Sequence, residues 1–224
     1  MRQVKIAPSL MCSDFIRLGE ELDVMRDERI DYLHIDIMDG HYVPNLTLGP
    51  DFCKKVREHL PITLDIHLMI EKPDALLSLF VGIPNIILSI HPETTYHPIR
   101  TLQTIRDGGA RAGIVIDPGM PFGAVSELLP FVDLVCVMTV NPGYAGQKLI
   151  DSTLPKIREV ADAAARGGYQ IEVEVDGNVS WQNIPHMVES GAQVLVAGSS
   201  SLYDRSADLA QNIRRMRALV GGAR

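Results

Sequence analysis

The stretch DYLHIDIMDGH, residues 31–41, alternates two kinds of side chain. Leu33, Ile35 and Ile37 fall on one side of a strand because successive side chains point to opposite faces. The opposite side carries Tyr32, His34, Asp36 and Met38. The stretch therefore predicts a strand with one aliphatic face and one face that presents an imidazole and a carboxylate.

Seven further apolar runs have the length of strands, with amphipathic segments between them. The eight predicted strands are residues 4–9, 31–38, 62–70, 85–91, 112–118, 134–140, 171–177 and 194–199. The predicted helical segments include 15–27, 73–80, 99–107, 153–165 and 181–190. Strands that alternate with helices indicate βαβ units and a parallel sheet.

Eight such units without a seam in composition predict an α/β fold: a single-domain (β/α)8 TIM barrel over residues 1–224. A doubly wound open sheet is the alternative. The count of eight favours the barrel, and so do the polar residues on one face of several strands, which suit a barrel interior. In such barrels the active site lies at the C-terminal ends of the strands.

The composition is that of an ordinary globular protein, with 46% hydrophobic residues and a formal charge of −7. The acidic balance and the lack of a basic cluster argue against nucleic-acid or membrane binding. Cys12, Cys53 and Cys136 are odd in number and form no CxxC pair, which predicts free thiols in a reducing compartment. With no apolar signal-peptide region and no run of transmembrane length, a cytoplasmic protein is expected.

The same alternation places polar side chains on two further strands. In residues 62–70 the polar face carries Thr63, Asp65, His67 and Met69, and in residues 171–177 it carries Glu172, Glu174 and Asp176. His34, Asp36, His67 and Asp176 lie towards the C-terminal ends of three predicted strands, so they are expected to converge on the barrel axis. Nitrogen and oxygen ligands suit a divalent ion such as Zn, Mn, Fe(II) or Co. The alternative is four isolated, hydrogen-bonded polar residues.

Other polar and sulfur-containing residues receive lesser roles. Asp65 lies nearer the middle of its strand and is expected to support His67 or a buried network. Surface or structural roles are expected for His41, His59, His91, His97 and His186. Met38, Met69 and Met138 occupy inward positions near strand ends, which fits either core filling or a polarisable, water-poor lining of the metal site.

Three glycine-bearing loops follow the last three predicted strands: NPGYAGQ (141–147), DGN (176–178) and GSSS (198–201). Glycine lets backbone N–H groups come close together and form an anion-binding nest. Barrel phosphate sites are often built from the loops after the seventh and eighth strands. The loops therefore predict a phosphate site, which uncharged N–H groups and a helix N-terminus can form in an acidic protein.

Seven motifs in order along nearly the whole chain resemble the ribulose-phosphate 3-epimerase family. They are SLMCSD (9–14), HIDIMDGHYVPNLTLGP (34–50), DIHLM (65–69), HPET (91–94), NPGYAGQ (141–147), EVDG (174–177) and VAGSS (196–200). The resemblance implies a barrel enzyme that inverts C3 of a phosphorylated ketose with one divalent metal ion and no organic cofactor. It also implies a homo-oligomer, either a dimer or a hexamer.

The resemblance also assigns roles by motif. His34, Asp36, His67 and Asp176 match the metal ligands, and Asp36 and Asp176 also match the paired acid and base. Ser9 matches a serine that contacts substrate. The residues that match the phosphate and substrate loops are Gly143, Tyr144, Ala145, Gly146, Gly177, Asn178, Gly198 and Ser199.

Several departures bear on the substrate. Most ribulose-phosphate enzymes have GFGGQ where this chain has GYAGQ and DGG where it has DGN, and they usually lack Cys12. The chain is more similar here to the D-allulose-6-phosphate 3-epimerase branch, so D-allulose 6-phosphate and D-fructose 6-phosphate are the expected substrate pair. D-ribulose 5-phosphate and D-xylulose 5-phosphate are the alternative. Asn178 is expected to restrict the phosphate nest.

Two other functions are alternatives to epimerisation. A decarboxylase of the orotidine type is disfavoured because its DxKxxD motif is missing. A non-catalytic sugar-phosphate-binding barrel would tolerate the loss of one carboxylate, yet both are present.

Overall fold

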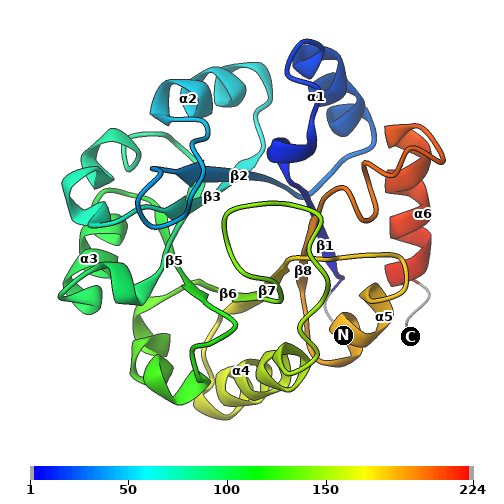
Figure 1. Cartoon of the computed structure of the whole chain (residues 1–224). Helices are drawn as coiled ribbons and strands as arrows, with labels where there is room; N and C mark the ends of the chain where they lie inside the picture. Colours follow the sequence, from blue (N-terminus) through cyan, green and yellow to red (C-terminus); the bar gives the residue numbers. More distant parts are fainter. Residues whose placement is uncertain (1–2, 222–224) are drawn as a thin grey trace.

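Eight parallel strands follow one another around a barrel in the computed structural model, which describes residues 3–221 (Figure 1). They are β1 (Lys5–Pro8), β2 (Tyr32–Met38), β3 (Thr63–Met69), β4 (Ile86–Ile90), β5 (Arg111–Ile116), β6 (Leu134–Met138), β7 (Glu172–Asp176) and β8 (Val194–Ala197). Each strand from β2 to β7 pairs in parallel with the next, and β8 pairs with β1. A parallel bridge between Ser9 and His34 joins β1 to β2 and closes the ring. The barrel prediction is confirmed, and the open doubly wound sheet is excluded.

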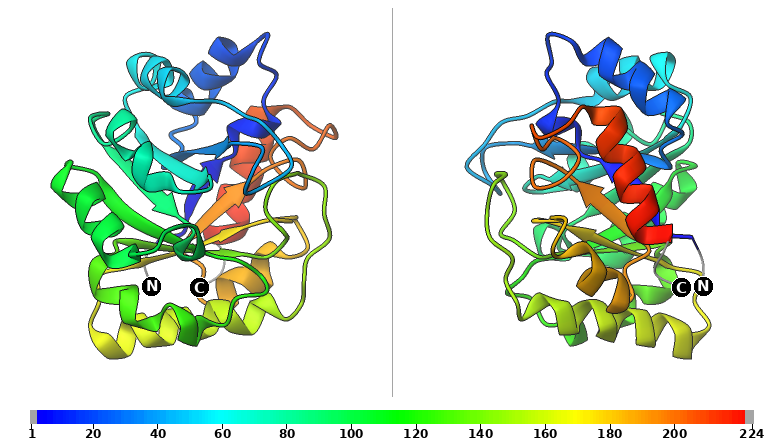
Figure 2. Two further views of the ribbon diagram at one scale, coloured as in Figure 1. Left: turned by 60° about the vertical axis from the view of Figure 1, so that its left-hand side comes forward. Right: turned by 90° about the vertical axis from the view of Figure 1, so that its right-hand side faces the viewer.

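The α-helices lie around the outside of the barrel (Figures 1 and 2). They are α1 (Leu18–Asp27), α2 (Pro50–His59), α3 (Pro98–Asp107), α4 (Thr153–Gly167), α5 (Ile184–Glu189) and α6 (Leu209–Gly221). Proline at the first position of α2 and of α3 costs no hydrogen bond, because that N–H has no partner within a helix. Gly168 ends α4 with a φ of 67°, a conformation that favours glycine. Among the described residues, no helix is long and apolar enough to cross a bilayer.

Two of the seven connections between consecutive strands contain short 3-10 turns instead of an α-helix. The helix predicted over residues 73–80 is wrong: the segment forms the turns Pro73–Ala75 and Leu77–Leu79. 3-10 turns are common in short connectors, and the amphipathic spacing of this segment does not distinguish them from an α-helix. The connection after β5 likewise forms Phe122–Ala124 and Ser126–Phe131, where Pro130 interrupts regular helical hydrogen bonding.

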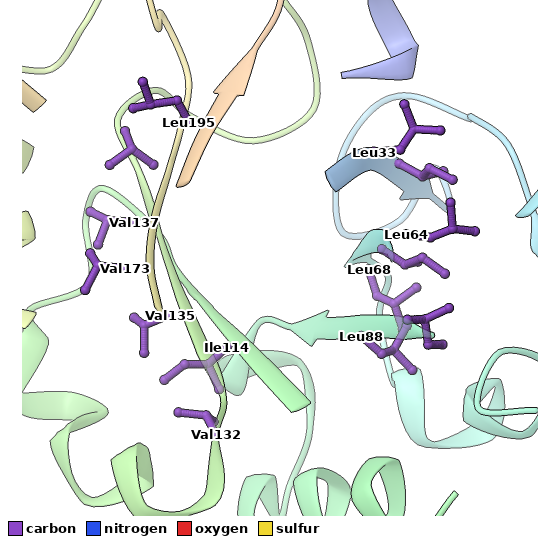
Figure 3. Close-up of a cluster of buried hydrophobic side chains, with 14 of the residues drawn as sticks. Leu33, Leu64, Leu68, Leu88, Ile114, Val132, Val135, Val137, Val173 and Leu195 are labelled. Atoms are coloured by element: carbon purple, nitrogen blue, oxygen red, sulfur yellow. The ribbon is translucent and has the colours of Figure 1, made fainter. Parts of the chain in front are cut away.

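The aliphatic faces of the strands point outward, towards the helices. Figure 3 shows Leu33, Leu64 and Leu88 on one side of the barrel, with Val137 and Val173 on the other, all directed away from its centre. These five side chains are at most 1% exposed. Loss of one such leucine to alanine typically costs about 2–5 kcal/mol of stability. This outer layer fixes the strands and thereby aims their polar faces at the axis.

The inward faces fill the barrel in layers. Lys5, Tyr32, Arg111 and Glu172 lie together at the N-terminal ends of their strands. Asp65 and Glu174 occupy a buried middle layer, where Gly113 is needed because a Cβ there would lie 2.1 Å from a neighbouring serine oxygen. The C-terminal ends carry the residues predicted for the site. Cys12, Cys53 and Cys136 are free thiols, as expected.

Candidate active site

The four predicted metal ligands converge at the C-terminal end of the barrel. One ligand atom from each of His34, Asp36, His67 and Asp176 lies within 4.8 Å of the others. Asp36 Oδ1 is 3.2 Å from His34 Nε2 and 3.3 Å from His67 Nδ1. Asp176 Oδ2 is 3.8 Å from both of these nitrogens. Convergence follows from the register, because Asp36 of β2 pairs with His67 of β3.

This cluster fits a divalent cation. Ligand atoms 3.2–3.8 Å apart suit metal bonds of about 2.0–2.2 Å to imidazole nitrogen and carboxylate oxygen. His67 Nδ1 is buried and has no hydrogen-bond partner among residues 3–221, an unusual state for a polar atom unless an ion uses its lone pair. Two carboxylates would neutralise the charge of such an ion.

The two imidazoles are held by different partners. His34 Nδ1 lies 2.5 Å from Asp65 Oδ2, since Asp65 sits opposite His34 in the β2–β3 register. Of the two roles expected for Asp65, the structure shows support of a buried network, and the histidine that Asp65 contacts is His34. His67 Nε2 lies instead 2.9 Å from His91 Nε2.

His91 is the site residue that the sequence reasoning set aside. It is fully buried, whereas the other four histidines in that group, His41, His59, His97 and His186, are exposed. Its Nδ1 lies 2.9 Å from the Tyr42 hydroxyl, and that hydroxyl donates to Glu93 Oε1 over 2.8 Å. The signal was present in residues 85–91, because their alternation places Ile87, Ser89 and His91 on the inward face.

The two aspartates differ strongly in electrostatics. Although burial opposes ionisation, the adjacent His34 and His67 hold the pKa of Asp36 far below its usual range. Burial raises the pKa of Asp176 to about 6, with the negative charge of Asp36 adding to the effect and His34 opposing it. Burial opposes the charging of His34 too, yet Asp36 and Asp65 raise its pKa well above 6.5. Carboxylates whose environments separate their pKa values are suited to act as a base and an acid.

Hydrogen bonds fix the position of Asp36. The Ser9 hydroxyl donates to Asp36 Oδ2 over 3.1 Å, so the two carboxylate oxygens face different partners. Thr47 Oγ1 donates to the Asp36 carbonyl over 2.6 Å and accepts from the Met38 N–H over 3.0 Å. The end of β2 is therefore tied to the loop that follows it.

A pocket opens above this cluster, and every residue predicted to bind substrate lines it. They are Ser9, Met38, Met69, Met138, Gly143, Tyr144, Ala145, Gly146, Gly177, Asn178, Gly198 and Ser199, together with Asp36 and Asp176. Sequence reasoning missed other lining residues, among them Met11, Val140, Asn141 and Gln147. Met38, Met69 and Met138 are at most 4% exposed and form apolar walls. Cys12 also lines the pocket, and burial raises the pKa of its thiol to about 11, so it stays neutral at pH 7.

The loop after β6, residues 139–152, crosses the mouth of the barrel in Figure 1. Gly143 has a φ of 112°, and a Cβ there would lie 2.9 Å from Val43 Cβ. Asn45 Nδ2 donates to the carbonyl of Gly143 over 3.0 Å. Asn178 Nδ2 donates to the carbonyl of Gln147 over 2.6 Å. The side chain of Asn178 is thus used to hold this loop, while its effect on a bound phosphate stays a prediction.

Comparison with solved structures supports the fold. A mutant tryptophan synthase α-subunit from the hyperthermophile Pyrococcus furiosus superimposes with a TM-score of 0.68 at 12% identity, covering 99% of this chain and 100% of that chain. Phosphoribosyl anthranilate isomerase from Thermus thermophilus gives a TM-score of 0.66 at 13% identity, covering 98% and 100%. At such low identity these matches establish the barrel alone.

Comparison of sequences identifies the family. The model of the "Ribulose-phosphate 3 epimerase family" matches residues 5–202. A relative named ribulose-phosphate 3-epimerase from Bacillus subtilis (strain 168) is 44% identical over 204 residues, which cover 91% of this chain and 94% of the relative. A relative of the same name from Escherichia coli (strain K12) is 39% identical over 206 residues, covering 92% and 91%. The chain belongs to the ribulose-phosphate 3-epimerase family, whose members are carbohydrate epimerases of the isomerase class.

Proposed function

We propose that this protein is a metal-dependent ketose-phosphate 3-epimerase that interconverts D-ribulose 5-phosphate and D-xylulose 5-phosphate. The observation that carries the proposal is the pair Asp36 and Asp176, whose carboxylates converge with two imidazoles on one site. The names of the relatives favour the five-carbon substrate, which the sequence analysis held as its alternative. They give no support to the expected preference for D-allulose 6-phosphate.

Epimerisation at C3 removes the proton next to the C2 carbonyl and returns a proton to the opposite face. The reaction therefore needs one acid/base group on each face of the carbon. Asp36 and Asp176 converge on one site and supply these two groups: one removes the C3 proton, and the other returns a proton to the opposite face. The reverse reaction exchanges these roles. Ser9 donates to Asp36 Oδ2 and keeps that oxygen oriented.

The remaining groups of the site bind the substrate and stabilise the negative charge that forms during the reaction. A divalent ion held by His34, Asp36, His67 and Asp176 would act as a Lewis acid that stabilises the negative charge of the enediolate. Met38, Met69 and Met138 exclude water, which strengthens electrostatic interactions at the reacting carbon. Backbone N–H groups of the loops around residues 143–146, 177–178 and 198–199 bind the phosphate.

The test is proton exchange at C3. Metal-loaded protein is incubated in heavy water with D-ribulose 5-phosphate or D-allulose 6-phosphate, and NMR follows the loss of the C3 proton and the appearance of the epimer. We expect exchange and epimer formation with the pentulose to be the faster. Faster exchange with the hexulose would overturn the substrate assignment, and exchange with neither would favour a sugar-phosphate-binding protein.

The two aspartates are tested by isosteric substitution. Asp36→Asn and Asp176→Asn are each expected to lower turnover by at least about 100-fold, because each removes a proton-transfer group. The metal content of each variant is measured in parallel, since both residues are also proposed ligands. Asp51→Asn, at an exposed position on α2, is the matched control and should retain full activity. Full turnover by Asp36→Asn would contradict the mechanism.

A further inference from the structure

We propose that His91, Tyr42 and Glu93 are positioning residues, which form a hydrogen-bond chain that sets the tautomer of His67 so that its Nδ1 faces the metal. The inference rests on the proposed metal site. None of these three residues lines the pocket, and none contacts an atom that is proposed to bind the metal.

The chain begins at the ring nitrogen of His67 that faces away from the cluster. His67 Nδ1 lies 3.3 Å from Asp36 Oδ1 and has no hydrogen-bond partner among the described residues. Its Nε2 lies 2.9 Å from His91 Nε2, and the two ring planes are inclined by 29°, with centroids 5.1 Å apart. Both side chains are at most 1% exposed, so water does not compete for this contact.

Two imidazole nitrogens that face each other need one donor and one acceptor. If His67 Nδ1 offers its lone pair to a metal, the ring proton is on Nε2, which then donates to His91 Nε2. The proton of neutral His91 is then on Nδ1, 2.9 Å from the Tyr42 hydroxyl. Each ring nitrogen of His67 and His91 therefore has one defined role as a hydrogen-bond donor, a hydrogen-bond acceptor or a metal ligand.

The far end of the chain determines its direction. The Tyr42 hydroxyl donates to Glu93 Oε1 over 2.8 Å, and His91 Nδ1 lies 3.4 Å from the same oxygen. An ionised carboxylate only accepts hydrogen bonds, and it is a stronger acceptor than a neutral imidazole nitrogen. The hydroxyl proton therefore goes to Glu93, and the hydroxyl oxygen is left to accept from His91 Nδ1. The partly exposed carboxylate of Glu93 thus sets the orientation of the buried ligand His67 through two intervening residues, Tyr42 and His91.

The structural elements explain why these residues meet. Tyr42 lies in the loop after β2, and Glu93 lies in the 3-10 turn Pro92–Thr94 directly after β4. Both loops flank β3, which carries His67. The Tyr42 and His91 rings are also in contact, with centroids 4.6 Å apart. Groups that orient a ligating histidine typically change metal affinity by about 10–100-fold when removed.

The test measures zinc affinity and the protonation of ring nitrogens, both independent of turnover. Zinc binding is measured by competition with a chromophoric chelator, and long-range 1H–15N NMR reports which nitrogen of His67 carries the proton. In the zinc-loaded wild-type protein we expect the proton of His67 on Nε2. His91→Phe is expected to weaken zinc binding about 10–100-fold, because the Nε2–H of His67 then lacks an acceptor. His91→Gln, whose amide oxygen can accept in place of Nε2, should recover affinity to within several-fold of the wild type.

Two further variants keep the test decisive. Tyr42→Phe removes one link without creating a cavity and should weaken zinc binding several-fold, even if His91→Phe fails to fold. His59→Phe, at an exposed position on α2, is the control and should bind zinc as the wild type does. Unchanged zinc affinity in both His91→Phe and Tyr42→Phe, or a proton on His67 Nδ1 in the zinc-loaded wild type, would overturn the proposal. Failure of the proposed epimerase activity would instead appear as absent turnover with zinc binding intact.

Discussion

Asp65 and Glu174 are buried carboxyl groups of the same barrel layer with different tasks. Asp65 Oδ2 contacts His34 Nδ1, which directs His34 Nε2 towards Asp36 and Asp176. Burial, reinforced by the charge of Asp65, raises the pKa of Glu174 well above its usual value, which favours the neutral form of this carboxyl group. Asp65 thus orients a ligand, whereas burial favours the neutral form of Glu174.

Substitution of these two residues separates their roles. Asp65→Asn removes the negative charge that orients and supports His34, so we expect zinc affinity to fall by about 10-fold or more. Glu174→Gln introduces a neutral amide of the same shape at a position where burial already favours a neutral side chain, and it should change zinc affinity by no more than a few-fold. Chelator competition at pH 7 measures both. Equal losses of zinc affinity in the two variants would indicate that any change in this layer weakens binding, and would contradict a specific role of Asp65 in orienting His34.

At the scale of elements, the loop after β6 is held at two carbonyls by asparagines from neighbouring loops. Asn45 binds Gly143, and Asn178 binds Gln147. Asn178 Oδ1 also accepts from Asn183 Nδ2 over 2.7 Å, at the N-terminus of α5. Asn178 therefore connects the loops after β6 and β7 to a helix. Its φ of 43° lies in the left-handed region, which asparagine tolerates better than most residues.

Asn178→Gly tests whether this connection matters for substrate binding. The substitution relieves backbone strain but removes hydrogen bonds that each contribute roughly 0.5–1.5 kcal/mol, so the loop after β6 should be less ordered. We expect KM for the phosphorylated ketose and the inhibition constant of inorganic phosphate to rise about 3–10-fold, the range that one such bond corresponds to, with a smaller change in kcat. Asn85→Gly is the matched control, because Asn85 also has a positive φ but lies at the opposite end of the barrel, just before β4. An unchanged KM in Asn178→Gly would show that the loop is ordered without this bridge.

The alternation of residues 31–38, 62–70 and 171–177 was sufficient to predict which side chains face the axis, because a strand has only two faces. It could not predict that Asp65 contacts His34, since that depends on the register between β2 and β3. The amphipathic spacing of residues 73–80 suited an α-helix, but the segment forms two 3-10 turns, which such spacing does not distinguish from an α-helix. His91 was missed because its role depends on the ring of His67, which belongs to another strand.

At the scale of the whole molecule, the end of the barrel away from the site is closed by a charged network. Glu172 on β7 contacts Lys5 on β1, accepts from the Tyr32 hydroxyl over 2.6 Å and accepts from Arg111 over 2.9 Å. Arg111 also donates to the Tyr32 hydroxyl over 3.0 Å. Four strands, β1, β2, β5 and β7, thus meet at one carboxylate. Although burial opposes ionisation, hydrogen bonds from Lys5, Tyr32 and Arg111 hold the pKa of Glu172 below 4.5.

A folded-state pKa below the unfolded value stabilises the protein above the unfolded pKa, and this stability is lost as the pH falls through the folded pKa. Glu172→Gln should therefore lower the free energy of unfolding by about 1–3 kcal/mol at pH 7, because Lys5 and Arg111 lose their shared anion. The difference in the free energy of unfolding between variant and wild type should narrow as the pH falls below 4.5, where Glu172 itself becomes protonated. Urea denaturation at pH 7 and at successively lower pH, followed by the fluorescence of Trp181, measures both.

Glu58→Gln, which removes an exposed carboxylate paired with Lys55, is the control and should leave stability nearly unchanged at every pH. The rate of epimerisation by folded Glu172→Gln should match the wild type, because the network lies at the opposite end of the strands from Asp36 and Asp176. If the free energies of unfolding of Glu172→Gln and wild type differ by the same amount at pH 7 and well below pH 4.5, glutamine packs poorly at this position. A difference that disappears at low pH would show that charge at this end of the barrel, separately from the site, holds β1, β2, β5 and β7 together.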